Sequence, residues 1–286
     1  MKSRLAFWLV LFLIIIVAGC AGVDGGEDSP ALSTPGDEVF FDNGDDFFIA
    51  VHCKPGAVPV STEYAARNWP ALTDLVKSAD EHHMKLTLLF NPQWVMYILE
   101  DGARLELVRR WEANGHEPGL YHHGPSMNDW NGYTNQEKHF GSHKFMGTIR
   151  EMMVLINRLP ASGQMNTACV NSVDQEFDFP QGVIYEISGV SDKLEDLWST
   201  PTEFTSNGQD VLRLTCANYA ARGSEVDIDL EEMKQLLDEN DGDEVMGITF
   251  HAFEYADNAI PFDALFELLD ERGIHAKSVS VIMEAL

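Results

Sequence analysis

The chain has 286 residues and a strongly acidic balance, with 46 Asp and Glu against 19 Lys and Arg and a formal net charge of −27 at pH 7. A charge of this sign repels the phosphates of nucleic acids and anionic lipid headgroups, so we expect neither as a partner. Once the N-terminal segments are set aside, roughly 240 residues remain, which is enough for one large domain with a substantial core.

The first twenty residues have the pattern of an export signal. Lys2 and Arg4 precede an unbroken apolar run, Leu5–Val17, which is shorter than the about 20 residues that a membrane-spanning helix needs. The run ends in Ala18-Gly19-Cys20, which resembles a prokaryotic lipoprotein cleavage box. The resemblance implies a signal peptide over residues 1–20, a lipid on Cys20, and a protein outside the cytoplasm that is anchored to a membrane. An uncleaved signal anchor is the alternative.

The next segment, residues 21–46, is rich in Gly, Ser, Pro and acidic residues and contains no Lys or Arg. Such a composition has too little apolar surface to offset the entropy of ordering, so we expect a flexible tether. The folded domain is then expected over residues 47–286.

Three cysteines follow Cys20, which is an odd number for an oxidising compartment. Cys169 and Cys216 both stand at the ends of predicted strands and could pair, although sequence does not give their distance. Cys53 would then stay free beside His52.

Hydrophobic periodicity predicts alternating strands and helices along the body of the chain. The predicted strands are Phe47–Val51, Lys85–Phe90, a segment leading into His122, Met165–Val170, Val183–Ile187, Val211–Cys216 and Val245–Phe250. The predicted helices are a segment with Leu72, Leu75, Val76 and Ala79 on one face, Ala103–Asn114, Gln136–Leu159, Leu230–Leu237 and Phe262–Asp270, with a terminal segment Ser278–Leu286.

This alternation predicts an α/β fold in which helices cover a parallel sheet, either as a barrel or as an open doubly wound sheet. In both architectures functional residues gather at the carboxyl ends of the strands. Histidines follow three of the predicted strands: His52, the pair His122-His123, and His251.

Three strand-end histidine positions are enough for one catalytic metal site, because catalytic zinc characteristically has three protein ligands and an open position for water. A bound metal would lower the pKa of that water and polarise a carbonyl, which is the chemistry of ester or amide hydrolysis. The alternative for His52 and His251 is a structural histidine bonded to the backbone.

The order of these features resembles the polysaccharide deacetylase (carbohydrate esterase) superfamily, over most of the body. Gly115-His116-Glu117-Pro118-Gly119 is similar to the Gly-His-Glu-x-Gly lead-in to that family's metal histidines, and Ile248-Thr249-Phe250-His251 to its late strand with a histidine that protonates the leaving group. The resemblance implies an irregular (β/α) barrel of the glycoside hydrolase and deacetylase type, a divalent metal such as zinc, and an acylated glycan or other acylated substrate.

The chain departs from the family pattern at three places. Val51-His52-Cys53-Lys54 replaces the paired Asp-Asp after the first strand, and Tyr121 and Pro125 occupy the two metal-histidine positions. The arginine-proline motif is absent from Gln164–Asn171.

Two interpretations follow. In the first, a rebuilt site is a metal-dependent hydrolase: His52, His122 and His123 bind the metal, and the catalytic histidines are His52 and His251, with His251 as the acid. The base is then the metal-bound hydroxide or a carboxylate such as Asp174 or Asp178, which with Glu176 also fits a solvated turn. In the second, Lys54 and Tyr121 mark the loss of the site, because a lysine repels a divalent cation. The chain is then an inactive glycan- or solute-binding lipoprotein.

Aromatic and amide side chains follow the histidine pair, and Trp130, Tyr133 and Asn135 are the candidate substrate-binding residues. Aromatic faces stack on the apolar faces of sugars, while the sugar hydroxyls need polar partners. An ordinary long loop packed by its own aromatics is the alternative.

Overall fold

The structure is a computed structural model, and it describes residues 46–188, 198–219, 228–239 and 245–286. All of these belong to one compact unit, Phe41–Leu286. The predicted signal peptide, Cys20 and the predicted tether up to residue 45 lie outside the described residues. Within the described ranges, none of the helices has both the length and the apolar character needed to cross a membrane.

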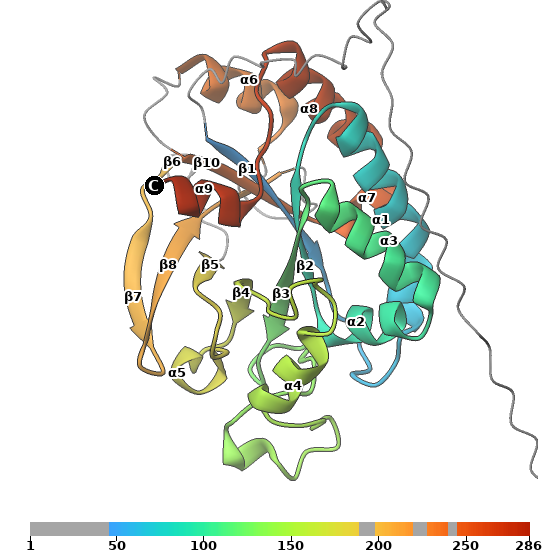
Figure 1. The fold of residues 1–286 in the computed structure, drawn as a ribbon, viewed down its shortest axis with the longest axis vertical. Coiled ribbons are helices and arrows are strands. Elements are labelled where there is room, and N and C mark those ends of the chain that lie inside the picture. Colours follow the sequence, from blue (N-terminus) through green and yellow to red (C-terminus); the bar gives the residue numbers. More distant parts are fainter. Residues whose placement is uncertain (1–45, 189–197, 220–227, 240–244) are drawn as a thin grey trace, which may run out of the picture. The chain divides into compact units, whose positions relative to one another are not determined.

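The predicted alternation of strands and helices is confirmed as a mixed α/β fold built on one sheet (Figure 1). The strands pair in the order β6-β10-β1-β2-β3-β4-β5-β8-β7, and every neighbouring pair from β10 to β8 is parallel. The strands are β1 (Phe47–Cys53), β2 (Leu86–Phe90), β3 (Glu117–His123), β4 (Thr167–Asn171), β5 (Tyr185–Ser188), β6 (Trp198–Ser199), β7 (Thr202–Ser206), β8 (Gln209–Thr215), β9 (Ala217–Asn218) and β10 (Val245–His251).

The chain connects the two ends of this strand order. β8 runs through Cys216 into β9, and β9 pairs with β10 at the opposite end of the order. Over the described residues, however, the hydrogen bonds do not close into one continuous ring, since β6 and β7 end the order. The sheet is therefore strongly curled, and the closed barrel remains an expectation.

Helices pack on the outer side of the sheet, and the short C-terminal helix α9 (Val279–Ala285) packs on the inner side. In Figure 1, α1, α3, α7 and α8 lie beside β1, β2 and β10, whereas α9 lies near β5 and β8. The helices are α1 (Glu63–Glu81), α2 (Pro92–Leu99), α3 (Gly102–Ala113), α4 (Ile149–Ile156), α5 (Gln175–Asp178), α6 (Leu230–Glu239), α7 (Ala252–Asp257), α8 (Ile260–Glu271) and α9 (Val279–Ala285), with a 3-10 turn η1 (Glu137–His139).

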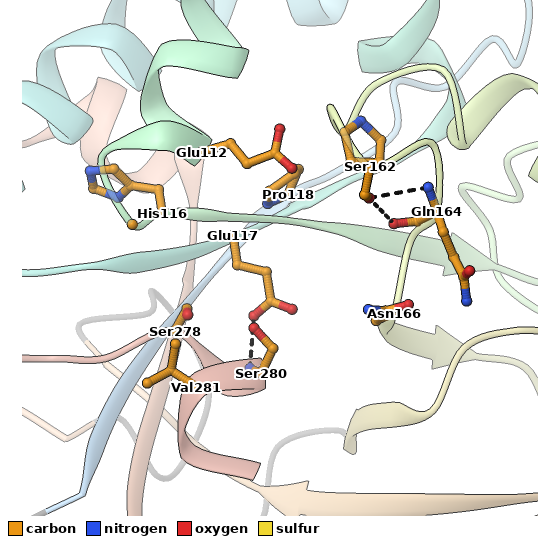
Figure 2. A pocket seen from close by; sticks show the side chains of 12 residues that line it. Glu112, His116, Glu117, Pro118, Ser162, Gln164, Asn166, Ser278, Ser280 and Val281 are labelled. Atoms are coloured by element: carbon orange, nitrogen blue, oxygen red, sulfur yellow. Dashed lines mark hydrogen bonds between the residues drawn. The ribbon is translucent and has the colours of Figure 1, made fainter. Parts of the chain in front are cut away.

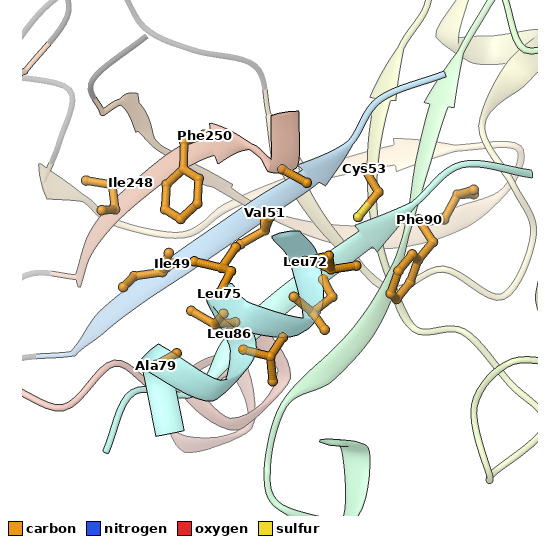
Figure 3. Close-up of a cluster of buried hydrophobic side chains, with 14 of the residues drawn as sticks. Ile49, Val51, Cys53, Leu72, Leu75, Ala79, Leu86, Phe90, Ile248 and Phe250 are labelled. Carbon is orange, nitrogen blue, oxygen red and sulfur yellow. The ribbon is translucent and has the colours of Figure 1, made fainter. Parts of the chain in front are cut away.

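The apolar core has two parts, one on each face of the sheet. Ile49 and Val51 of β1 pack outward against α1, as Figure 3 shows, while Phe48 and Ala50 point to the inner face. Because side chains alternate along a strand, burial on both faces needs a continuous apolar run, which is what Phe47–Val51 supplies. The same alternation places His52 on the inner face.

The predicted helix Gln136–Leu159 is wrong in its first half. Residues 124–147 form a long loop containing η1, and α4 begins only at Ile149. Thr148 caps α4 through a reciprocal capping box with Glu151. This Thr-x-x-Glu pattern is the sequence signal that marks the true start of the helix. The prediction also omitted α2, α5, α7, β6, β7 and β9.

The described cysteines are all free and buried, so Cys169 and Cys216 do not pair. Cys169 lies on β4 and Cys216 follows β8, with β5 between these two strands. Two strand spacings amount to about 9–10 Å, which exceeds the reach of a disulfide.

Candidate functional site

The inner face of the sheet brings together the side chains at the carboxyl ends of four strands. The register sets His52 of β1 opposite His251 of β10, and His123 of β3 opposite Asn171 of β4. Tyr121 lies on the same inner face, in the inner apolar cluster. The expectation that strand ends gather the candidate residues therefore holds for His52, His123 and His251.

Tyr121 occupies the middle of this group. Its ring stacks on His52, with centroids 4.4 Å apart and planes inclined by 14°, and meets His123 edge to face at 4.6 Å. His251 lies 5.3 Å from His52 between ring centroids. A phenol ring thus stands between two of the histidines that were expected to share a metal ion.

Both ring nitrogens of His123 have protein partners. Its Nδ1 lies 2.7 Å from Asp129 Oδ1, and its Nε2 lies 3.2 Å from Asn171 Nδ2. Since a carboxylate only accepts and the amide nitrogen only donates, His123 carries its proton on Nδ1 and accepts at Nε2. The other amide hydrogen of Asn171 is directed to the Tyr121 hydroxyl, at 3.2 Å.

Asp129 links this histidine to Lys54, whose Nζ lies 3.2 Å from Asp129 Oδ2. Burial raises the pKa of Asp129, but the hydrogen bond from His123 and the charge and hydrogen bond of Lys54 outweigh it, so the pKa lies well below its usual range. Asp129 is therefore a carboxylate, and it holds the partly exposed Lys54 in an ion pair.

His52 is neutral. Burial, followed by the charges of His251, His123 and Lys54, keeps the pKa of His52 well below 6.5. Its Nε2 lies 3.2 Å from Thr249 Oγ1, and that hydroxyl donates to the Ala50 carbonyl at 2.9 Å. Because the hydroxyl hydrogen is used there, the His52 Nε2 donates to Thr249.

His251 lies at the boundary between the site and solvent, with 21% of its side chain exposed. Its backbone N donates to Glu254 Oε2 at 2.7 Å, and its Nδ1 lies 3.3 Å from the same oxygen. Glu254 is the third residue of α7, whose N-cap is His251, so its carboxylate reaches back and orients this ring.

The predicted metal ligand His122 does not join His52 and His123. Neighbouring residues of a strand point to opposite faces, so His122 lies on the outer side. There its Nδ1 accepts from Asn131 at 3.1 Å, and within the described part of the chain its Nε2 has no partner. Burial lowers the pKa of His122 to about 4.

The donor set does not fit a metal ion. The Nε2 lone pair of His123 is engaged by Asn171, and Tyr121 fills the space between His52 and His123. In the ranges that the structure covers, no three His, Cys, Asp or Glu side chains are arranged to hold one. Neutral imidazole lone pairs directed at one point are what a zinc site needs, and this group does not present them.

The candidate substrate residues Trp130 and Tyr133 are buried, and Trp130 Nε1 donates to the Tyr133 carbonyl at 3.0 Å. They pack the loop that they belong to, which was the alternative reading. Asn135 is exposed, and its Oδ1 accepts from Ile149 N at 3.1 Å.

Sequence reasoning missed the polar partners of the histidines. Asp129, Thr249 and Asn171 were read as parts of a loop or a strand, and Glu254 was not considered. Only Glu254 had a signal, its spacing of three residues from His251, which is that of a capping box.

At the amino-terminal ends of the strands, opposite the histidine cluster, lies a cavity of about 260 Å³, shown in Figure 2. Glu117 lies there and accepts hydrogen bonds from Thr87, Thr167 and the backbone N of Ser280. The carboxylate thus ties β2, β3, β4 and α9 together. Residues at the amino-terminal ends of parallel strands generally stabilise the fold rather than take part in its chemistry. The hydrogen bonds of Glu117 fit such a stabilising role.

The solved structures that are similar to this chain include the following two. A 4-alpha-glucanotransferase from Thermococcus litoralis superposes with a TM-score of 0.54 at 12% identity, covering 85% of this chain and 38% of that one. A "putative polysaccharide deacetylase" from Mycobacterium smegmatis superposes with a TM-score of 0.53 at 12% identity, covering 88% of this chain and 94% of that one.

At this identity the likeness shows the fold alone. The second structure is matched over nearly its whole length, so the likeness in fold extends over both chains. This chain spans well under half the length of the glucanotransferase, with 38% covered. No protein-family model and no curated protein matches the sequence.

Proposed function

We propose that this chain is a carbohydrate-binding protein on a deacetylase-like α/β fold, whose histidine cluster does not act as a metal-dependent hydrolytic centre. The observation that carries the proposal is Tyr121, stacked on His52 at 4.4 Å and in edge contact with His123 at 4.6 Å. A carbohydrate ligand is supported by the fold, because the two similar structures described above are carbohydrate-active by name.

The cluster is better suited to rigidity than to turnover. His123 is held at both nitrogens, and His52 donates to a hydroxyl that is itself bonded to the backbone. A catalytic base needs a free lone pair within reach of its proton. Here the lone pair of His123 receives an amide hydrogen instead.

A metal-dependent deacylase, with zinc and an acyl-glycan substrate, is the second candidate. The clustering of the His52, His123 and His251 rings at one end of the sheet favours it. It would require Tyr121 and Asn171 to leave their present contacts.

One experiment separates the two candidates. Tag-free protein is titrated with tetra-N-acetylchitotetraose, cellotetraose and maltotetraose by calorimetry, assayed for acetate release from the first, and analysed for zinc by mass spectrometry. We expect binding of one oligosaccharide without acetate release and without stoichiometric zinc. Acetate release that His251→Ala abolishes would establish the hydrolase instead, and failure to bind any of the three would remove the carbohydrate assignment.

We also propose that the protein is held at a membrane outside the cytoplasm by a lipid on Cys20, as the cleavage-box pattern of residues 17–20 implies. In a bacterial host, Cys20→Ala is expected to move the protein from the membrane fraction to a soluble or uncleaved form, because two acyl chains supply the anchoring. Fractionation and the mass of the N-terminal peptide check this. An unmodified Cys20 in membrane-bound protein would contradict it.

A further inference from the structure

A cleft lies between the loop after β3 and residues 174–177, which lead from β4 into α5. Its volume is about 370 Å³, within the range typical of small-molecule sites. It is lined by Asn135, Gln136, Glu137, Lys138, Asp174 and Phe177. A second hollow of about 480 Å³ shares Asn135 with it and has Arg150, Asn157 and Asn207 on its walls.

The two walls of the cleft are fixed to each other by a single buried carboxylate. Asp178 of α5, fully buried, accepts from the hydroxyls of Thr134 and Ser172, both at 2.6 Å. It also accepts from Gln136 Nε2 at 2.7 Å and from Asn135 N at 3.3 Å. Four donors from two loops meet on one side chain, so the cleft is formed before any ligand arrives. A preformed site loses less entropy on binding.

Phe177 is the apolar element of the cleft. Phe177 is 52% exposed as a residue, although the next two residues, Asp178 and Phe179, are fully buried. The backbone of α5 is therefore held in place while the ring of Phe177 faces solvent. An exposed aromatic on a rigid wall is an apolar surface that a ligand can cover.

Polar groups surround that ring. Lys138 Nζ and Asp174 Oδ2 form an ion pair across the cleft at 3.5 Å, and both side chains are largely exposed. The Asn135 amide is oriented by its bond to Ile149 N. These groups offer donors and acceptors around one aromatic face, which matches the hydroxyls that ring the apolar face of a pyranose.

We infer that this cleft is a saccharide subsite, in which Phe177 stacks on a sugar ring and Lys138, Asp174 and Asn135 bind its hydroxyls. The ligand is an uncharged sugar unit, because a chain of net charge −27 repels acidic glycans. This inference rests on the carbohydrate-binding function proposed above and places it on Phe177, in the role that was expected of Trp130 and Tyr133.

The test compares two neighbouring exposed apolar residues. Phe177→Ala removes the stacking face, while Val173→Ala truncates a side chain that is 80% exposed in the same segment but is not part of the cleft. The oligosaccharide that the full chain binds, among the three probes named above, is titrated into both variants. We expect about tenfold weaker binding for Phe177→Ala and unchanged binding for Val173→Ala, since an aromatic contact contributes on this scale.

Two further readouts keep the outcomes distinct. Both variants should keep the thermal midpoint of the parent, because neither side chain is buried. Lys138→Met should weaken binding less than Phe177→Ala. If the parent binds and Phe177→Ala binds equally well, the subsite is wrong while the carbohydrate-binding function stands. If the parent binds no probe, the function itself fails, and the subsite fails with it.

Discussion

Gly247→Ala is expected to destabilise the domain by about 3 kcal/mol or more, the upper range for overpacking a buried site. Gly247 of β10 pairs with Phe48 of β1, and a Cβ added there would lie 1.9 Å from Phe48 Cζ and 2.1 Å from Cε1. Phe48 is fully buried on the inner face, so its ring has no free space to enter. Calorimetry should show a thermal midpoint lower by about 10 °C.

The control is Gly102→Ala at the start of α3, where an added Cβ meets nothing within 4 Å. It is expected to be neutral or slightly stabilising, since Ala is a better helix former than Gly. Phe48→Leu combined with Gly247→Ala should recover part of the loss, because the smaller side chain vacates the space. A Gly247→Ala variant as stable as the parent would show that the ring is not packed over this glycine.

His122 is expected to make the domain sensitive to acid. Burial lowers its pKa from 6.5 to about 4, so between these values the unfolded chain binds a proton that the folded chain does not. Where the unfolded state holds more protons, stability rises with pH, so it falls as the pH drops from 6.5 to about 4. The loss attributable to His122 is about 2 kcal/mol at pH 5 and about 3 kcal/mol at pH 4, at roughly 1.4 kcal/mol per pH unit.

His122→Gln should remove the loss of stability at low pH that His122 causes. Glutamine does not titrate, and its carbonyl can still accept from Asn131, so the cost at pH 7.5 should be about 1 kcal/mol or less. Urea unfolding at pH 7.5, 6, 5 and 4 should show the variant overtaking the parent as the pH falls. His143→Gln, at an exposed position, controls for the loss of a histidine. Parallel pH profiles for parent and His122→Gln would contradict the prediction.

The fold was predictable where one segment carries its own signal. The apolar run Phe47–Val51 indicated a strand buried on both faces, and Gly115 correctly ended the helix before β3. Residues 136–147 were predicted as helix although they belong to the loop that follows β3, because Phe145 lies four residues before Ile149 and continues the apolar spacing of α4. Contacts with distant residues hold this loop instead, such as Thr134 and Gln136 on Asp178.

By itself the sequence determined the α/β class, the acidic surface and which strand ends carry histidines, because these follow from composition, periodicity and the direction of the strands. Only the tertiary structure decided what those histidines do. Strand alternation sent His122 and His123 to opposite faces, and the curled sheet set Tyr121 between His52 and His123. The partners Asp129 and Asn171 then engaged both nitrogens of His123. Which lone pairs stay free depends on neighbours from other strands and loops, and no local pattern specifies them.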